Sequence, residues 1–242
     1  MKYQIDTIPV WEALDYQGGC MLCTLWTKTE AGEIERVLGS SVMEPGVRVR
    51  TNELGICAAH QRMMFQSGSR LAHALLMDTH SGLVLEKLEK LKTQAERGRD
   101  VNGSQLAGKL NALSSQCIVC QTIQTHMERY IYTLLYLWKT DPKFKRQFEA
   151  SNGVCIPHAA ALIDASQKHL NAQQRKAFTK LCLNLLYDHL REDEEDLKWF
   201  TQKFDYKNQS KPWGNSKNAI ERTVNRLRGY CLGDVPYEKV KK

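Results

Sequence analysis

Four short pairs of cysteine and histidine decide how this chain is organised: CMLC at 20–23, GICAAH at 55–60, CIVC at 117–120 and GVCIPH at 153–158. In each pair the second residue follows the first cysteine by three positions. With 8 cysteines and 7 histidines in 242 residues, chance predicts roughly half of one such pair. The presence of four therefore indicates a common chemical purpose.

The pairs recur in the same order, which indicates an internal duplication. Each CxxH pair begins 34 or 35 positions after the preceding CxxC pair and follows a glycine by two residues. We therefore expect two copies of one unit, each supplying three cysteines and one histidine. The expected ligand sets are Cys20, Cys23, Cys57 and His60 in the first copy, and Cys117, Cys120, Cys155 and His158 in the second. The spacing also allows the other arrangement, in which Cys20 and Cys23 join Cys155 and His158.

Two donors three positions apart lie on one face of a helical turn and can bind the same ion. Two such turns supply three thiolates and one imidazole, a donor set that suits tetrahedral Zn²⁺. We expect two Zn²⁺ ions, thiolates favoured by nearby helix N-termini, and tight turns at Gly55 and Gly153. Iron–sulfur clusters use the same soft donors and are the alternative cofactor. Disulfides suit a reducing compartment poorly, and a redox CxxC expects a βαβ context that this chain lacks.

The rest of the chain predicts a mainly α fold of two helical pseudo-repeats, each built around a Cys₃His metal site, followed by a basic C-terminal helix. The expected domains are residues 1–98, 99–206 and 207–242. Helices are expected to begin near each cysteine pair, and long helices are expected over 69–97 and 171–204. The segment 40–55, which contains Pro45 and Gly46, is expected to be a loop, and Asn215 or Ser216 is expected to cap the last helix.

The formal net charge of +7 comes from the C-terminal end. Residues 198–242 carry 11 Lys and Arg against 4 Asp and Glu, whereas the two signs balance over 1–197. We expect first a solvated basic helix. Such an end also attracts nucleic acid, anionic lipid or an acidic partner, and the candidate contacts are Lys217, Arg222, Arg226 and Arg228. We expect the acidic run REDEED at 191–196 to be solvated. We expect Trp199, Phe200 and Phe204 to form a buried stripe, the alternative being a stacking surface for single strands.

The composition excludes several classes of protein. Apolar residues make up 42% and charged residues 25%, which is typical of globular domains. No apolar run approaches the roughly 18 residues of a membrane span, and the N-terminus lacks a signal-peptide layout, so we expect a cytoplasmic protein. The sequence has no phosphate loop, nucleophile elbow or HExxH motif, so a familiar hydrolase or nucleotide enzyme is not expected. Cys182 is expected in the core and Cys231 as an exposed thiol.

The cysteine pairs occur together with TIPVWEAL, SVMEPGVRVRTNELGIC, WFTQKFDY and KPWGNSK. In this combination the chain resembles an uncharacterised bacterial family that is defined only as a domain of unknown function. The likeness runs from Thr7 to about Arg226 and includes all eight expected ligands. It implies a small cytoplasmic protein and no assigned activity.

Two hypotheses follow for the function. A site with four protein ligands has no open position for substrate. The first hypothesis is therefore a structural-zinc adaptor or regulatory protein that binds another macromolecule. Nucleic acid is one candidate for that macromolecule. The alternative is an iron–sulfur or thiolate-based redox protein or enzyme.

Overall fold

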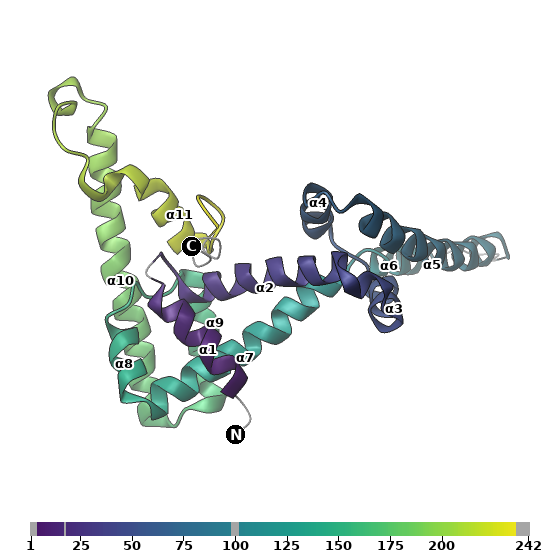
Figure 1. The fold of residues 1–242 in the computed structure, drawn as a ribbon, viewed down its shortest axis with the longest axis horizontal. Coiled ribbons are helices and arrows are strands. Elements are labelled where there is room, and N and C mark those ends of the chain that lie inside the picture. The colour runs from purple at the N-terminus through teal and green to yellow at the C-terminus, as the bar shows by residue number, and fades with distance from the viewer. Residues whose placement is uncertain (1–3, 17, 98–101, 236–242) are drawn as a thin grey trace. The chain divides into compact units, whose positions relative to one another are not determined.

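A computed structural model describes residues 4–16, 18–97 and 102–235, whose regular structure is entirely helical (Figure 1). The mainly α prediction is confirmed. The α-helices in these residues are α1 (Gln4–Asp15), α2 (Met21–Leu38), α3 (Pro45–Leu54), α4 (Ala58–Gln66), α5 (Arg70–Arg97), α6 (Gly103–Ala112), α7 (Ile118–Thr140), α8 (Pro142–Glu149), α9 (Ile156–His169), α10 (Ala172–Gln202) and α11 (Ala219–Arg228). Short 3-10 helices are η1 (Ser40–Met43), η2 (Tyr206–Asn208) and η3 (Gly214–Asn218). None of the described helices is long and apolar enough to cross a membrane.

The chain forms two compact units whose borders fall inside two long helices. The first unit combines Met1–Lys28 with His126–Lys242, and the second unit is Thr29–Thr125. Helices α2 and α7 therefore each begin in one unit and end in the other. The domain borders expected after residues 98 and 206 describe the sequence repeat, and they stay a prediction. The compact units divide the chain at other residues.

Aromatic side chains form the core of the first unit. Phe144, Phe148 and Phe178 are fully buried, and their rings stack in succession with centroids 6.3 and 6.2 Å apart. Trp138 meets Phe178 edge to face at 4.9 Å, and Trp11 meets Phe144 in the same way at 5.1 Å. Aromatic pairs in these arrangements contribute about 0.5–1.5 kcal/mol each beyond the burial of their area. This core joins α1, α7, α8 and α10.

The second unit has a smaller core, which includes Val42, Met64, Leu76, Ile118 and Ile123. The long helix α5 buries only Leu76 of its 28 residues. Apolar burial is the main favourable contribution to folding, and its magnitude follows the area removed from water. Because the second unit buries less apolar area than the first unit, its stability depends more on interactions other than apolar burial.

The expected loop over 40–55 is wrong, because Ser40–Met43 forms η1 and Pro45–Leu54 forms α3. Pro45 lies in the first turn of α3, where its missing N–H costs no hydrogen bond, so this proline begins a helix. The expected cap of the last helix is also wrong. Residues 214–218 form η3, and α11 begins at Ala219 with Asn218 as its N-cap residue.

The tight turns expected at the two glycines are confirmed. Gly55 and Gly153 have φ values of +66° and +67°. Residues other than glycine rarely adopt this backbone conformation. A Cβ atom on Gly55 would lie 3.1 Å from the ring of His80, and one on Gly153 would lie 3.3 Å from Cβ of Leu185. Each glycine lies two residues before the cysteine that is the N-cap of a CxxH helix, so the turn sets where that helix begins.

The turn at Gly55 yields the first prediction. Gly55→Ala should lower the free energy of unfolding by about 1–3 kcal/mol, because alanine is strained at φ +66° and ψ −165°. Gly32→Ala is the matched control, since it lies inside α2 with no heavy atom within 4 Å of the added methyl group. The control should raise the free energy of unfolding by roughly 0.5–1 kcal/mol. Chemical denaturation measures both, and effects of the same sign would contradict this account of the turn.

Candidate metal centres

The eight predicted donors gather into two clusters, each able to hold one metal ion. Cys20, Cys23, Cys155 and His158 form the first centre, which lies wholly in the first unit. Cys57, His60, Cys117 and Cys120 form the second centre, which lies wholly in the second unit. In each centre the four donor atoms lie within 4.8 Å of one another. The expected presence of two Cys₃His sets is confirmed, but their expected grouping by copy is wrong: each centre takes its CxxC pair from one predicted copy and its CxxH pair from the other.

The rigid helices after the CxxC pairs explain this exchange. Cys20 and Cys23 lie at the start of α2, whose 18 residues span about 27 Å, while Cys57 follows α2, η1 and α3. In the second unit the later part of α2 lies beside the start of α7, because the Thr122 hydroxyl donates to Glu33 at 3.0 Å. The start of α7 thereby delivers Cys117 and Cys120 to the CxxH pair of the second unit.

Short contacts define the first centre. Nδ1 of His158 lies 3.4 Å from Sγ of Cys20, 3.4 Å from Sγ of Cys23 and 3.2 Å from Sγ of Cys155. The sulfurs of Cys23 and Cys155 are 3.7 Å apart. Cys23 and Cys155 are buried, while Cys20 and His158 are half-buried.

The second centre repeats this geometry with more exposure. Nδ1 of His60 lies 3.2 Å from Sγ of Cys57, 3.3 Å from Sγ of Cys117 and 3.5 Å from Sγ of Cys120. The sulfurs of Cys57 and Cys120 are 3.9 Å apart. His60 and Cys117 are buried, and Cys120 is exposed.

These distances fit one tetrahedral ion in each centre. Bonds of about 2.3 Å to sulfur and about 2.1 Å to nitrogen place two sulfurs about 3.8 Å apart, and sulfur and nitrogen about 3.6 Å apart. The observed sulfur separations of 3.7 and 3.9 Å agree with the first value, and the sulfur–nitrogen separations come within a few tenths of an ångström of the second. A disulfide would need sulfurs about 2.05 Å apart, and every cysteine is a free thiol.

All four donor pairs lie in the first turn of a helix. Cys20 and Cys117 directly precede α2 and α7. Cys57 and Cys155 are the N-cap residues of α4 and α9, and neither side chain caps its own helix by a hydrogen bond. Two helix N-termini therefore point at each centre, and their partial positive charge favours thiolate over thiol.

Two contacts outside the donor sets orient or stabilise the ligands. Nε2 of His60 lies 2.9 Å from the Glu30 carboxylate. This contact orients the ring so that Nδ1 is the nitrogen available as a metal ligand. The backbone N–H of Tyr230, after α11, donates to Sγ of Cys23 at 3.3 Å. Sequence reasoning missed Glu30 and Tyr230, because neither lies at a fixed spacing from a ligand.

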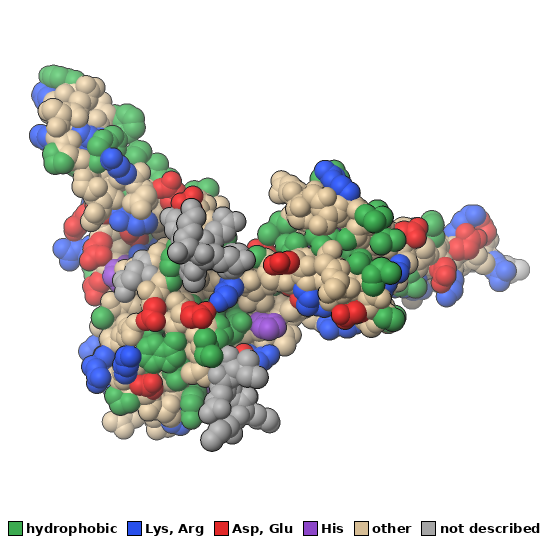
Figure 2. All heavy atoms as spheres, in the orientation of Figure 1, with side chains coloured by type: hydrophobic (Ala, Val, Ile, Leu, Met, Phe, Trp, Pro, Cys, Tyr) green, Lys and Arg blue, Asp and Glu red, His purple; other side chains and the backbone are tan. Residues whose placement is uncertain are grey.

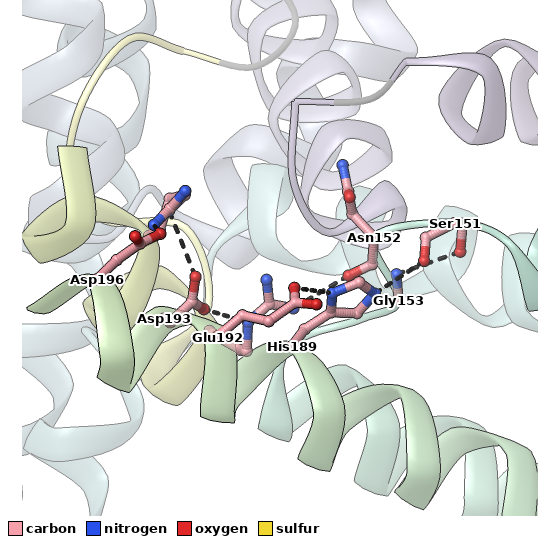
Figure 3. Close-up of polar contacts among 9 residues, drawn as sticks. Ser151, Asn152, Gly153, His189, Glu192, Asp193 and Asp196 are labelled. Atoms are coloured by element: carbon pink, nitrogen blue, oxygen red, sulfur yellow. Dashed lines mark hydrogen bonds and ion pairs between the residues drawn. The ribbon is translucent and has the colours of Figure 1, made fainter. Parts of the chain in front are cut away.

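Two histidines hold the glycine turns, and sequence reasoning missed their role as well. His80 of α5 bonds through Nδ1 to the carbonyl of Asn52 at 3.0 Å. His189 of α10 bonds through Nε2 to the carbonyl of Ser151 at 3.0 Å, as Figure 3 shows. His80 follows Gly55 by 25 residues, whereas His189 follows Gly153 by 36. The unequal offsets hide this correspondence from a search for repeats.

The charge balance of both centres favours a cation. The pKa of His60 is raised to about 10, first by its hydrogen bond to Cys117 and then by Glu30. Burial lowers the pKa of His158, but its contacts with Cys155 and Cys20 outweigh burial and raise that pKa to about 10. Burial raises the pKa of Cys117, yet its hydrogen bond with His60 brings that pKa down to about 6. Without a metal ion each histidine therefore keeps a proton that a divalent cation would replace.

The other predicted residues have mixed outcomes. Arg222 and Arg226 form ion pairs with Asp193, and Arg222 also pairs with Asp196. Asp193 is only 3% exposed, so the expectation that the whole run 191–196 is solvated is wrong. Lys217 and Arg228 are exposed, and the nucleic-acid role of all four basic residues stays a prediction.

Both lone cysteines lie where they were expected. Cys182 is fully buried, and burial raises the pKa of its thiol to about 12; Cys231 is exposed. The expected burial of the aromatic stripe is wrong at Phe204, which is 72% exposed. Trp199 and Phe200 are half-buried.

The chain belongs to the family of unknown function DUF6062, whose model matches residues 1–234. This match confirms the resemblance to an uncharacterised domain family. No curated protein and no solved structure matches the chain. Membership of this family implies no activity.

The exchanged grouping yields the second prediction, which counts metal ions in double variants. Cys20→Ser with Cys155→Ser removes two donors from one centre and should leave one metal equivalent, whereas Cys20→Ser with Cys57→Ser should leave none. Grouping by copy predicts the reverse for these pairs. Elemental analysis of the purified variants distinguishes the two arrangements, and Cys182→Ser, outside both centres, is the control with full metal content.

Proposed function

We propose that this DUF6062 member is a zinc protein in which two closed Cys₃His centres hold a helical scaffold that binds another macromolecule. The observation that carries the proposal is the gathering of three sulfurs and one imidazole nitrogen, twice, at the spacing of a tetrahedral ion. Three thiolates and one imidazole suit Zn²⁺ and leave a net charge of about −1 on the loaded site. The proposal includes a reducing, cytoplasmic location, since the thiols must stay reduced to bind.

The compactness of the donor sets supports a single ion over an iron–sulfur cluster. The four protein ligands of a cluster do not all bind the same iron atom, so some of them lie farther apart than the ligands of one ion. Here all four donor atoms of a centre lie within 4.8 Å of one another. Among the residues that the structure describes, CMLC and CIVC are flanked by helices and no strand, which also disfavours a thioredoxin-type dithiol.

The number of protein donors supports a structural role for the metal. Four ligands fill a tetrahedral ion, so no position is left for substrate or water. Structural zinc contributes about 10–16 kcal/mol in small zinc-finger peptides, which matches or exceeds the roughly 5–15 kcal/mol total stability of a domain. Such a contribution would be decisive in the second unit, whose helix α5 buries only Leu76.

An aromatic and basic surface at the end of α10 supports the interaction role. We call residues 199–213 the tip; Phe204 and Tyr206 are 72% and 77% exposed there. Hydrophobic and basic side chains lie side by side at the free end of this helix (Figure 2). Lys207 lies over the ring of Tyr206, with Nζ 5.6 Å from its centroid. Exposed rings beside lysines are what single-stranded nucleic acid requires for stacking and phosphate contacts.

The backbone of the tip is held in place by buried hydrogen bonds. The Lys203 ammonium, which is buried, donates to the carbonyls of Asn208, Gln209 and Lys211 at 2.6–2.9 Å. The indole N–H of Trp199 donates to the carbonyl of Pro212 at 3.1 Å. A fixed loop keeps the exposed rings in position without the loss of conformational freedom that binding would otherwise require.

The third prediction concerns the metal itself. Protein purified without oxygen should be colourless and contain two zinc ions per chain, and Cys155→Ser or Cys57→Ser should each remove one and lower the melting temperature. Visible absorbance with iron and sulfide would contradict the proposal in favour of the cluster alternative. Full metal content in either serine variant would contradict the assignment of the ligands.

The fourth prediction concerns the partner. Phe204→Ala with Tyr206→Ala should weaken binding of a single-stranded oligonucleotide by roughly thirtyfold or more, since stacking contributes about 1–3 kcal/mol per base and two rings are removed. Fluorescence anisotropy measures the affinity, which should fall steeply as salt rises. The control is Tyr187→Ala, which removes a 66% exposed ring elsewhere on α10 and should leave the affinity unchanged. Binding that Tyr187→Ala weakens equally, or that salt leaves unchanged, would contradict a role of the tip.

A further inference from the structure

A cavity of about 880 Å³ in the first unit adjoins the first centre. Its lining includes Cys20, Cys23 and Cys155, together with residues of α10 and α11 and of the segments before α2 and after α11. Cys23 and Cys155 are only 5% and 1% exposed, and both belong to the lining of this cavity. An ion that enters or leaves the first centre needs such a space.

Acidic side chains dominate the charge of this cavity. Six carboxylates line it, against the guanidinium groups of Arg222 and Arg226; the carboxylates belong to Glu192, Asp193, Glu195, Asp196, Glu221 and Asp234. The two arginines are engaged by Asp193 and Asp196 (Figure 3). Counted by residue, the lining therefore has more negative than positive side chains, in a protein whose formal net charge is +7.

Two of these carboxylates, Glu192 and Glu195, lie mostly in solvent, so their contacts screen little of their charge. Glu192 bonds to Nδ1 of His189 at 3.1 Å, while Glu192 itself is 70% exposed. Glu195 pairs with Arg191 at 3.3 Å, but both side chains are more than 60% exposed, where an ion pair contributes little. A cavity with one sign of charge and low-dielectric walls concentrates ions of the opposite sign.

We infer that this cavity is the path by which a divalent cation reaches and leaves the first centre, and that its carboxylates admit cations while repelling anionic competitors for the metal. Carboxylate oxygens bind divalent ions weakly enough to pass them on to thiolates, which are the softer and stronger ligands for zinc. The cavity thereby gives the first centre a route along which metal ions exchange with solvent and which selects for positive charge. This inference rests on the proposed function, since it requires a metal ion in the first centre.

The experiment compares the removal of zinc from the purified holoprotein by two chelators of different charge. EDTA is anionic, and TPEN is a neutral chelator of high zinc affinity. The variant combines Glu192→Gln, Glu195→Gln and Glu221→Gln, which removes three negative charges from the lining and leaves the Asp193 ion pairs intact. The control combines Glu86→Gln, Glu89→Gln and Glu96→Gln, which removes as many charges from the exposed face of α5 in the second unit.

At low salt the cavity variant should release one zinc ion to EDTA roughly threefold to tenfold faster than the unaltered protein, and the difference should vanish at high salt. Removal by TPEN should be unchanged, and the control variant should behave like the unaltered protein with both chelators. Equal acceleration with both chelators would show loosening of the fold and would overturn the inference, as would no acceleration at all. Elemental analysis before the experiment distinguishes failure of the proposed function from failure of the cavity's role. A first centre without metal overturns both. A loaded first centre with unchanged release kinetics overturns only the role of the cavity.

Discussion

The convergence of two helix N-termini on four soft donors is the constraint on which the rest of the structure depends. In each centre a CxxC turn and a CxxH turn meet although more than 55 residues of chain separate them, and the contact fixes the start of two helices at once. Gathering three thiols around an imidazole costs free energy, because buried thiolates repel one another and lose their hydration. A divalent cation offsets that cost directly, which is why donor geometry and fold are inseparable here.

Because each centre takes donors from both predicted copies, this constraint acts between residues that are far apart in the sequence. The first unit takes Cys20 and Cys23 from one copy and Cys155 and His158 from the other, and the second unit does the converse. Helices α2 and α7 each begin at a centre in one unit and end in the other unit. No centre is complete within one copy, so a fragment that holds a single copy would present four donors that the fold assigns to different centres.

Charge is distributed by tertiary contacts in a way that linear runs conceal. The basic C-terminal end and the acidic run at 191–196 look like separate solvated features, yet Arg222 and Arg226 meet Asp193 and Asp196 between α10 and α11. Arg226 also donates to the carbonyl of Asn152, in the turn that precedes Cys155. The C-terminal helix is thereby joined to the first centre, and much of its basic charge is already neutralised within the fold.

Local chemistry determined much of this protein from sequence alone. The donor spacing placed Cys20, Cys57, Cys117 and Cys155 at helix starts, and glycine with positive φ was required at Gly55 and Gly153, because these features depend on a few neighbouring residues. Tertiary structure alone decided which pairs share a centre, that Glu30 orients His60, and that Asp193 is buried while Phe204 is exposed. These depend on which helix faces lie together, and the equal spacing of two similar copies is compatible with either partner. Only the packing of rigid helices selects between them.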